Sequence, residues 1–105
     1  MNKVVLIGRL VADPDVQEYG KGKNSGKLAR YRLAVDRAGS DEADFISCVT
    51  FGKGADFAED YLSKGMKIGV YGEIRTGSFE NKNGDKVYTT EVVVSQHEFC
   101  ESKKK

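Results

Sequence analysis

The segment from residue 28 to residue 36 constrains the fold most, because its apolar and polar side chains alternate with a period of two. The apolar set is Ala29, Tyr31, Leu33 and Val35, and the residues between them are Arg30, Arg32, Ala34 and Asp36. Such alternation is typical of a β-strand that buries one face and exposes the other. The pattern therefore predicts a half-buried strand over this segment.

Four further segments have the composition of strands, and one has that of a helix. Strands are predicted at 3–10, 45–51, 66–79 and 87–94, and the last can extend to about residue 99. Residues 54–64 break the β pattern, because Phe57, Tyr61 and Leu62 form one apolar stripe of a short helix. Gly65 is the expected end of that helix.

Polar and glycine-rich segments separate these elements at 20–27, 38–43 and 81–85, and the last contains the Asn-Gly signature of a hairpin. The element order is that of an all-β oligonucleotide/oligosaccharide-binding (OB) fold. This fold is a five-stranded Greek-key barrel with one short helix between strands three and four. The alternative is an open antiparallel sheet with the helix packed on one side. Closure is favoured, because open edge strands tend to pair with other chains.

A chain of 105 residues is long enough for one domain with one modest core. We expect the OB domain to span residues 1–100 and a basic tail, residues 101–105, to fray. No apolar run is long enough to cross a membrane, and the first ten residues lack the cleavage site of a secretory signal. Cys48 and Cys100 lie far apart without metal-type spacing, which favours reduced thiols in a cytoplasmic protein.

The strand predicted at 45–51 carries large apolar residues on both faces. If the face with Cys48 points into the core, three large side chains point outward: Phe45, Val49 and Phe51. Phe79 has a similar position on the fourth strand, near the hairpin tip. Outward rings can stack on nucleobases without reading their sequence. The alternative is that these rings pack in the core, in a subunit interface or against the hairpin.

Basic residues concentrate in segment 21–32, which contains three lysines, two arginines and no acid. Acidic residues concentrate in segment 41–44 and in the predicted helix. This segregation predicts a basic face, suited to the phosphates of nucleic acid, opposite an acidic face. The net charge of +1 argues neither for nor against such a partner, and a solvated surface of mixed charge is the alternative.

Catalytic signals are weak. The single histidine, His97, has no cysteine or metal-type partner in the sequence and is expected at the surface or at a strand end. Residues 20–23 are rich in glycine but lack the spacing and the following helix of a phosphate-binding loop. We therefore expect no enzyme, no cofactor and no metal. An OB-type nuclease would need a carboxylate cluster near an arginine, and no spacing supports one.

The ordered motifs resemble those of bacterial single-stranded DNA-binding proteins over almost the whole chain. The main matching segments are NKVVLIGRL at 2–10, FISCVTFGK at 45–53, GEIRT at 72–76 and YTTEVVV at 88–94. The resemblance implies an OB barrel assembled as a homotetramer (a dimer of dimers), with the first strand pairing subunits. It implies a protein that coats and protects single-stranded DNA, with little sequence preference, during replication, recombination or repair in the bacterial cytosol or nucleoid. An OB-type adaptor for RNA or protein is the alternative.

The resemblance also implies the site residues. Base stacking is expected at Phe45, Phe51 and Phe79. Phosphate contacts are implied at Lys3, Arg30, Lys53 and Arg75, and Arg30 rests partly on strand alternation. Arg9 and Arg32 are further expected phosphate contacts, from the distribution of basic residues along the chain. The hairpin at 37–44 is short and acidic and lacks the aromatic residue often found there, which suggests weaker binding or a smaller footprint. The long acidic-tipped tail of typical relatives is not part of this sequence, which is either a natural short form or a truncated one. If the chain is complete, tail-mediated protein partners are not expected.

Overall fold

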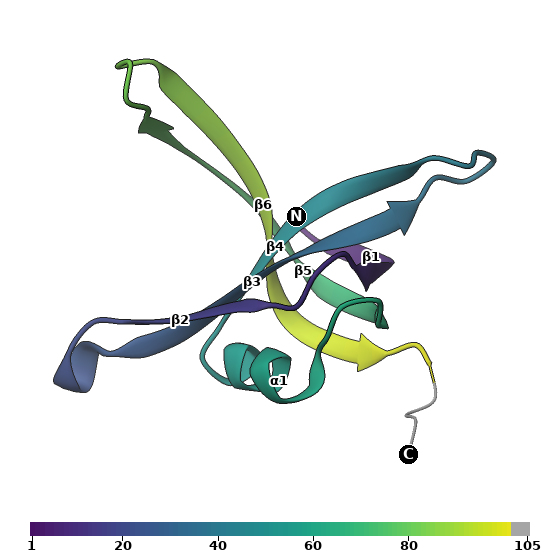
Figure 1. The fold of residues 1–105 in the computed structure, drawn as a ribbon, viewed down its shortest axis with the longest axis horizontal. Helices are drawn as coiled ribbons and strands as arrows, with labels where there is room; N and C mark the ends of the chain where they lie inside the picture. The colour runs from purple at the N-terminus through teal and green to yellow at the C-terminus, as the bar shows by residue number, and fades with distance from the viewer. Residues whose placement is uncertain (102–105) are drawn as a thin grey trace.

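The computed structural model describes residues 1–101 and shows an all-β fold with one short α-helix (Figure 1). The strands are β1 (Val4–Leu10), β2 (Asp15–Tyr19), β3 (Gly26–Asp36), β4 (Ala43–Phe51), β5 (Lys67–Glu80) and β6 (Lys86–Phe99). The helix α1 (Lys53–Tyr61) lies between β4 and β5, and a 3-10 turn, η1 (Gly22–Asn24), lies between β2 and β3. Residues 102–105, which make up most of the predicted tail, lie outside the described residues.

Five of the strands close into a barrel. They are ordered β1-β5-β6-β4-β3, and β1 pairs with β3 through Arg9–Ala34 and Leu10–Leu33, which completes the ring. The β4–β6 pair is parallel, and the other pairs are antiparallel. The predicted OB barrel is confirmed, and the alternative of an open sheet is wrong.

Strand β2 is the one strand that the sequence pattern does not reveal. It continues along the edge of β3 that β1 has left, from the pair Asp15–Arg30 to the pair Tyr19–Gly26. Only Val16 among its residues is partly buried. Because β2 is held mainly by backbone pairing with β3, its sequence carries no apolar alternation that would predict it.

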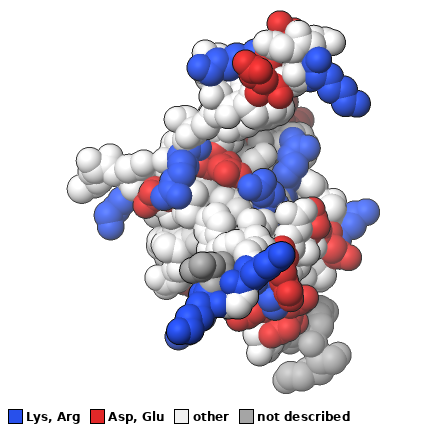
Figure 2. Space-filling model, turned by 90° about the vertical axis from the view of Figure 1, so that its left-hand side faces the viewer, with Lys and Arg blue, Asp and Glu red and all other residues white. Residues whose placement is uncertain are grey.

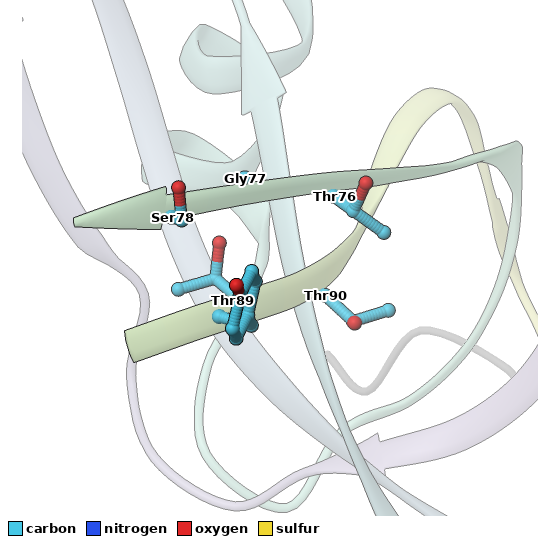
Figure 3. A pocket seen from close by; sticks show the side chains of 6 residues that line it. Thr76, Gly77, Ser78, Thr89 and Thr90 are labelled. Carbon is cyan, nitrogen blue, oxygen red and sulfur yellow. The ribbon is translucent and has the colours of Figure 1, made fainter. Parts of the chain in front are cut away.

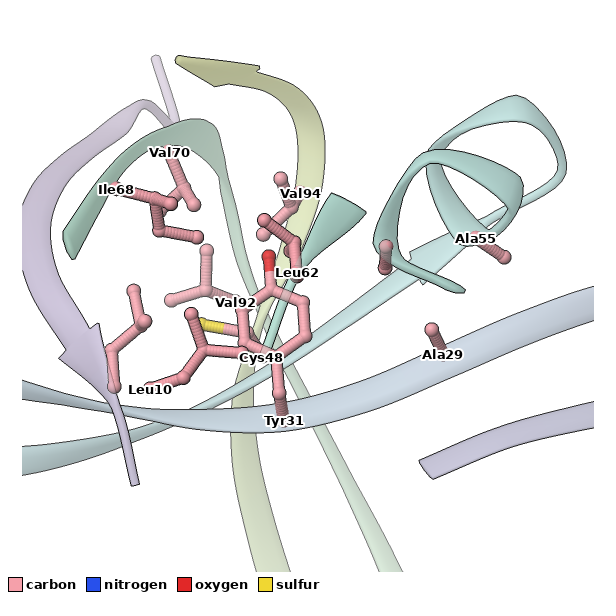
Figure 4. Packing of buried hydrophobic residues seen from close by; sticks show 12 residues of the cluster. Leu10, Ala29, Tyr31, Cys48, Ala55, Leu62, Ile68, Val70, Val92 and Val94 are labelled. Atoms are coloured by element: carbon pink, nitrogen blue, oxygen red, sulfur yellow. The ribbon is translucent and has the colours of Figure 1, made fainter. Parts of the chain in front are cut away.

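The core fills the barrel between the sheet and α1 (Figure 4). Its buried residues are Leu10, Ala29, Tyr31, Leu33, Cys48, Ala55, Ala58, Leu62, Ile68, Val70, Val92 and Val94. The alternation predicted for residues 28–36 is confirmed in β3, where Ala29, Tyr31 and Leu33 are buried and Arg30 and Arg32 are exposed. One face of β3 therefore fills the barrel, and the other presents arginines to solvent.

Helix α1 covers one end of the barrel but is shorter than predicted. It ends at Tyr61, because Leu62 has extended backbone angles (φ −101°, ψ 141°), and Gly65 is not its cap. Ala55 and Ala58, both fully buried, pack inward, and their small side chains let the helix approach the sheet closely. Of the predicted apolar stripe, Phe57 packs partly buried against the core, Tyr61 is exposed, and Leu62 is buried but lies beyond the end of the helix. Among the described helices, none is both long and apolar enough to span a membrane.

Three hairpin arms extend from the barrel: β2–β3, β3–β4 and β5–β6 (Figure 1). The β5–β6 arm turns at the predicted hairpin, where the amide of Asn81 donates to the carbonyl oxygen of Asp85 at 2.9 Å. Gly84 has a φ of +82°, a backbone angle that residues other than glycine rarely adopt. The hairpin prediction is confirmed, and the arm carries its side chains clear of the barrel.

Candidate nucleic-acid interface

The outer face of the β3–β4 pair brings two of the three predicted stacking rings together with two arginines. Arg30 and Arg32 lie opposite the β4 positions between Phe45 and Phe51. Residues directly opposite one another in an antiparallel pair project to the same face of the sheet. Phe45, Phe51, Arg30 and Arg32 therefore share one surface, although they come from two strands.

Both rings on this surface are open to solvent. Phe45 is 57% exposed and Phe51 is 43% exposed. The guanidinium carbon of Arg32 lies 5.5 Å from the centre of the Phe45 ring, within the range of a cation–π contact. The surface thus presents an aromatic ring with a cation held beside it.

Val49 lies on the same outer face but is only 1% exposed, so the expectation that it points into solvent is wrong. Its neighbours in the sheet are Arg30 on β3 and Val93 on β6. Because β4 has partner strands on both sides at this position, flanking side chains cover a small residue there. Larger rings at either end of the strand stay exposed.

Phe79 is the third predicted ring and lies apart from the first two, on the β5–β6 arm. It is 55% exposed and pairs with Val87. Arg75 projects from the same face of β5, because strand side chains alternate. Its guanidinium lies 2.9 Å from the carboxylate of Glu73. The register places Arg75 at the edge of the barrel and Phe79 farther out on the β5–β6 arm, both on the outward side of the sheet that Phe45 and Phe51 share.

Lys3 and Lys53 are both exposed. Lys53 begins α1 two residues after Phe51, which places a cation at the end of the β3–β4 surface. Lys3 precedes β1. Neither lysine forms an ion pair within residues 1–101, and the same holds for Arg30 and Arg32.

Arg9 differs from these residues, because its guanidinium is already bound. It donates to the carbonyl oxygen of Gly65 and to the carboxylate of Glu101, both at 2.9 Å. The hydrogen bond from Arg9 holds the pKa of Glu101 below its ordinary value. Glu101, the first residue of the predicted tail, is thereby attached to the barrel.

The predicted separation of a basic face from an acidic face is wrong. The ammonium of Lys27 lies 2.8 Å from the carboxylates of both Asp56 and Glu59 on α1, and these hydrogen bonds raise its pKa. Arg37 is bound to Asp44 at 2.9 Å. Basic and acidic side chains alternate over the face shown in Figure 2. Binding of a polyanion would therefore depend on a few unpaired cations rather than on a uniform patch.

Tyr88, which the predicted site omits, is 75% exposed. It lies on β6 opposite Ser78, and the ammonium of Lys86 is 5.6 Å from its ring centre. Val87 and Tyr88 are adjacent in the sequence and point to opposite faces of the strand, so the sequence pattern does not show which of them is exposed. The exposure of both faces of the arm is visible only in the folded chain.

His97 lies near the end of β6, as one of the two expectations for it had it, and its side chain is partly buried rather than at the surface. Its Nε2 lies 2.7 Å from the hydroxyl oxygen of Tyr31, and its ring stacks on Phe57 with centres 5.1 Å apart. Burial lowers the pKa of His97 to about 4. The imidazole therefore links β6 to β3 and α1 in its neutral form, away from the exposed phenylalanines.

Within residues 1–101, no group of three or more histidine, cysteine, aspartate or glutamate side chains could hold a metal ion. An OB-type nuclease would need such a carboxylate cluster near an arginine.

A sequence model described as the single-strand binding protein family matches residues 1–100. The chain belongs to this family. Proteins of the single-strand binding family are non-enzymatic and bind DNA, so membership supports the expectation of a protein without catalytic activity.

Similar proteins agree with this assignment. A single-stranded DNA-binding protein of Clostridium perfringens is 48% identical over 103 residues, which are 97% of this chain and 67% of that protein. Single-stranded DNA-binding protein 2 of Staphylococcus aureus strain Mu50 is 43% identical over 105 residues, 98% of this chain and 74% of that protein. A Plasmodium falciparum SSB complex with ssDNA matches the fold with a TM-score of 0.82 at 26% identity, covering 96% of both chains.

Proposed function

We propose that this chain binds single-stranded DNA, and coats and protects it with little sequence preference, during replication, recombination or repair. The observation that carries the proposal is the β3–β4 surface, where exposed Phe45 and Phe51 flank Arg30 and Arg32. Aromatic rings bind bases, and arginines bind the phosphates between them. The similarity of the chain to bacterial relatives supports a location in the bacterial cytosol or nucleoid.

The base-stacking residues in this proposal are Phe45, Phe51 and Phe79. Each stacked base contributes about 1–3 kcal/mol in proteins of this type. Every nucleobase has a π-face, so rings of this kind bind all four bases, and little sequence preference follows.

The phosphate contacts divide into two groups. Arg30, Arg32, Lys53 and Lys3 have no carboxylate partner among the described residues. They can neutralise phosphates without first losing an ion pair. Arg9 and Arg75 are bound to Glu101 and Glu73, respectively, and must exchange a carboxylate for a phosphate. We expect these two arginines to contribute less to affinity.

Assembly as a homotetramer is part of the proposal. One edge of Val4–Gly8 pairs with β5, and the opposite edge pairs with no described strand. Val5 and Ile7 expose apolar side chains on β1. An open strand edge with apolar side chains is suited to pairing with a second copy, which would make the dimer from which a dimer of dimers is built.

A cavity of about 370 Å³ at the mouth of the barrel borders β1 at Val4 and Leu6 and the proposed DNA surface at Phe45. Its apolar lining residues are Val4, Leu6, Phe45, Ile46, Ile74 and Val92. Light scattering would give the mass in solution. The double variant Val5→Glu, Ile7→Glu is expected to have a lower mass than the parent. A monomeric mass for both the parent and the variant would contradict the assembly.

The binding proposal is tested by titrating labelled oligo-dT, a matched duplex and oligo-U at several salt concentrations, with an incubation in divalent metal to detect cleavage. Tight, salt-sensitive binding of oligo-dT without cleavage is expected. Phe45→Ala, Phe51→Ala and Phe79→Ala should each weaken it roughly 5- to 100-fold. Phe45→Trp keeps an aromatic ring and is the matched control, which should bind at least as tightly as the parent.

Equal affinity for duplex and single strand, or no binding at all, would favour the alternative of an adaptor for RNA or protein. Unchanged oligo-dT affinity in all three alanine variants would show that the rings do not bind bases. A shorter occluded length than in relatives with a longer β3–β4 hairpin is also expected, because the acidic hairpin here offers no aromatic residue.

A further inference from the structure

The β5–β6 arm exposes both of its faces once it leaves the barrel. Phe79 and its partner Val87 lie on one face. Residues that alternate with them project to the opposite side. This opposite side, termed here the reverse face, consists of Thr76, Ser78, Glu80, Lys86, Tyr88 and Thr90.

The reverse face is hollowed where Tyr88 projects. An open depression of about 460 Å³ is lined by the reverse-face residues Thr76, Ser78, Tyr88 and Thr90, and also by the pair Gly77 and Thr89, which alternate with them along the strands. Figure 3 shows these lining residues. The Tyr88 ring, at 75% exposure, gains little from folding, because most of its surface stays in water. A large ring on a rigid strand that is not needed for the core is available to bind a partner.

The chemistry of the reverse face repeats that of the Phe45 site. Lys86 lies 5.6 Å from the centre of the Tyr88 ring, and Arg32 lies 5.5 Å from the centre of the Phe45 ring. Each site thus combines a ring for a base with a cation for the neighbouring phosphate. Threonine and serine hydroxyls on the reverse face can donate hydrogen bonds to phosphate or sugar oxygens. Glu80, opposite Lys86, is the acidic member of this face.

The two sites are also continuous in space. Thr90 lines the depression beside Tyr88, and it also lines the cavity at the barrel mouth that Phe45 borders. The depression at Tyr88 and the cavity beside Phe45 therefore adjoin at Thr90, and a bound strand that leaves Phe45 can pass Thr90 to reach Tyr88. The hydroxyl-rich lining of the depression favours a polynucleotide over a second copy of this chain, because the centres of protein interfaces are more apolar.

We propose that Tyr88 is a further base-stacking residue, so that bound single-stranded DNA contacts the β5–β6 arm on both faces, at Phe79 and at Tyr88. The inference rests on the proposed single-stranded DNA binding and extends it to a surface outside the predicted site. It implies that the DNA turns around the arm rather than crossing one side of it.

Photocrosslinking tests the contact directly. The full chain is bound to oligo-dT in which 5-iodouracil replaces scattered thymines, irradiated, and the adducts are mapped by mass spectrometry. Adducts are expected at Tyr88 as well as at the phenylalanines. Tyr88→Ala should weaken binding of a long oligo-dT roughly 5- to 100-fold, whereas Tyr88→Phe, the matched control that keeps the ring, should stay within about twofold of the parent.

The outcomes separate this inference from the proposed function. Adducts at Phe45, Phe51 or Phe79 with none at Tyr88, and full affinity in Tyr88→Ala, would overturn the role of Tyr88 and leave DNA binding intact. A parent protein that does not bind oligo-dT would overturn both. A third outcome is a Tyr88→Ala variant with a lower mass in light scattering and unchanged affinity, together with no Tyr88 adduct in the parent. It would assign the reverse face to contact between copies and overturn the inference.

Discussion

The hydroxyl oxygen of Tyr31 lies 2.7 Å from Nε2 of His97, and this hydrogen bond joins β3 to β6 across the barrel. Both side chains are largely withdrawn from solvent, and burial lowers the pKa of His97 to about 4 from its ordinary 6.5. The stacking of His97 on Phe57 extends the link to α1. A neutral imidazole thus links β6 to β3 and α1, and protonation of the imidazole at low pH is expected to weaken this link.

Stability should therefore fall as the pH drops from about 6.5 to about 4. Between these values the unfolded chain binds more protons at His97 than the folded chain does, so the free energy of unfolding rises with pH across the window. The contribution is on the order of 1–2 kcal/mol after allowance for solvent screening. Urea unfolding at pH 7 and pH 4.5 measures it. His97→Gln removes the titration, and an equally steep pH dependence in that variant would contradict the assignment.

Gly72 should tolerate no side chain. A Cβ at this position would overlap the carbonyl oxygen of Val93, and it lies at the register shift between β5 and β6. Because a backbone atom cannot move without disturbing the strand pairing, Gly72→Ala is expected to cost about 1–3 kcal/mol of stability. Gly77→Ala is the control, since its Cβ would meet only the Thr89 hydroxyl at 3.3 Å. Equal losses of urea midpoint in both variants would refute the steric explanation.

The salt dependence of DNA binding should report Arg30 and Arg32. Each phosphate contact to a single strand contributes about 0.7 to the slope of log K against log salt concentration, so replacing both arginines by alanine should reduce that slope by about 1.4. Arg37→Ala is the comparison, because Arg37 is bound to Asp44 and Glu42. It should change the slope much less. A slope that is the same in the double variant and the parent would exclude phosphate contacts at these two positions.

The two thiols should differ in reactivity. Cys100 is exposed, whereas Cys48 is buried in the core and burial raises its pKa to about 12. Because the thiolate is the reactive form, iodoacetamide should modify one thiol per native chain and both in urea. Mass spectrometry of the labelled peptides distinguishes the sites. Rapid modification of Cys48 in the native protein would mean that the barrel opens readily.

Several features of the candidate site were predictable, because they depend on local periodicity. The alternation around Tyr31 identifies the buried face of β3, and with it the outward direction of Arg30 and Arg32. Periodicity leaves the outward face of residues 45–51 open, and it is the resemblance to the family that predicts Phe45 and Phe51 as outward rings, which their exposure bears out. The hairpin at residues 81–85 follows from the conformational freedom of glycine in a tight turn. Motif order along the chain then indicated the family that the comparison confirms.

Other features depend on segments that meet only in the folded chain. Strand β2 exists because β3 offers it an edge, and Val49 is buried because partner strands flank it on both sides. His97 is withdrawn from solvent because Tyr31 and Phe57 come from other elements. Lys27 is neutralised by carboxylates of α1 that lie far along the sequence. None of these contacts leaves a local pattern.

The amino-acid pattern alone thus establishes the inward face of β3 and the turn at residues 81–85, since each of these depends on a few neighbouring residues. Strand register and barrel closure settle the rest. They place Phe45 and Phe51 beside the arginines of β3, place Phe79 farther out on the β5–β6 arm, and open the face that carries Tyr88. The physical reason is that exposure and charge pairing depend on which strands lie side by side, which is a property of the closed sheet.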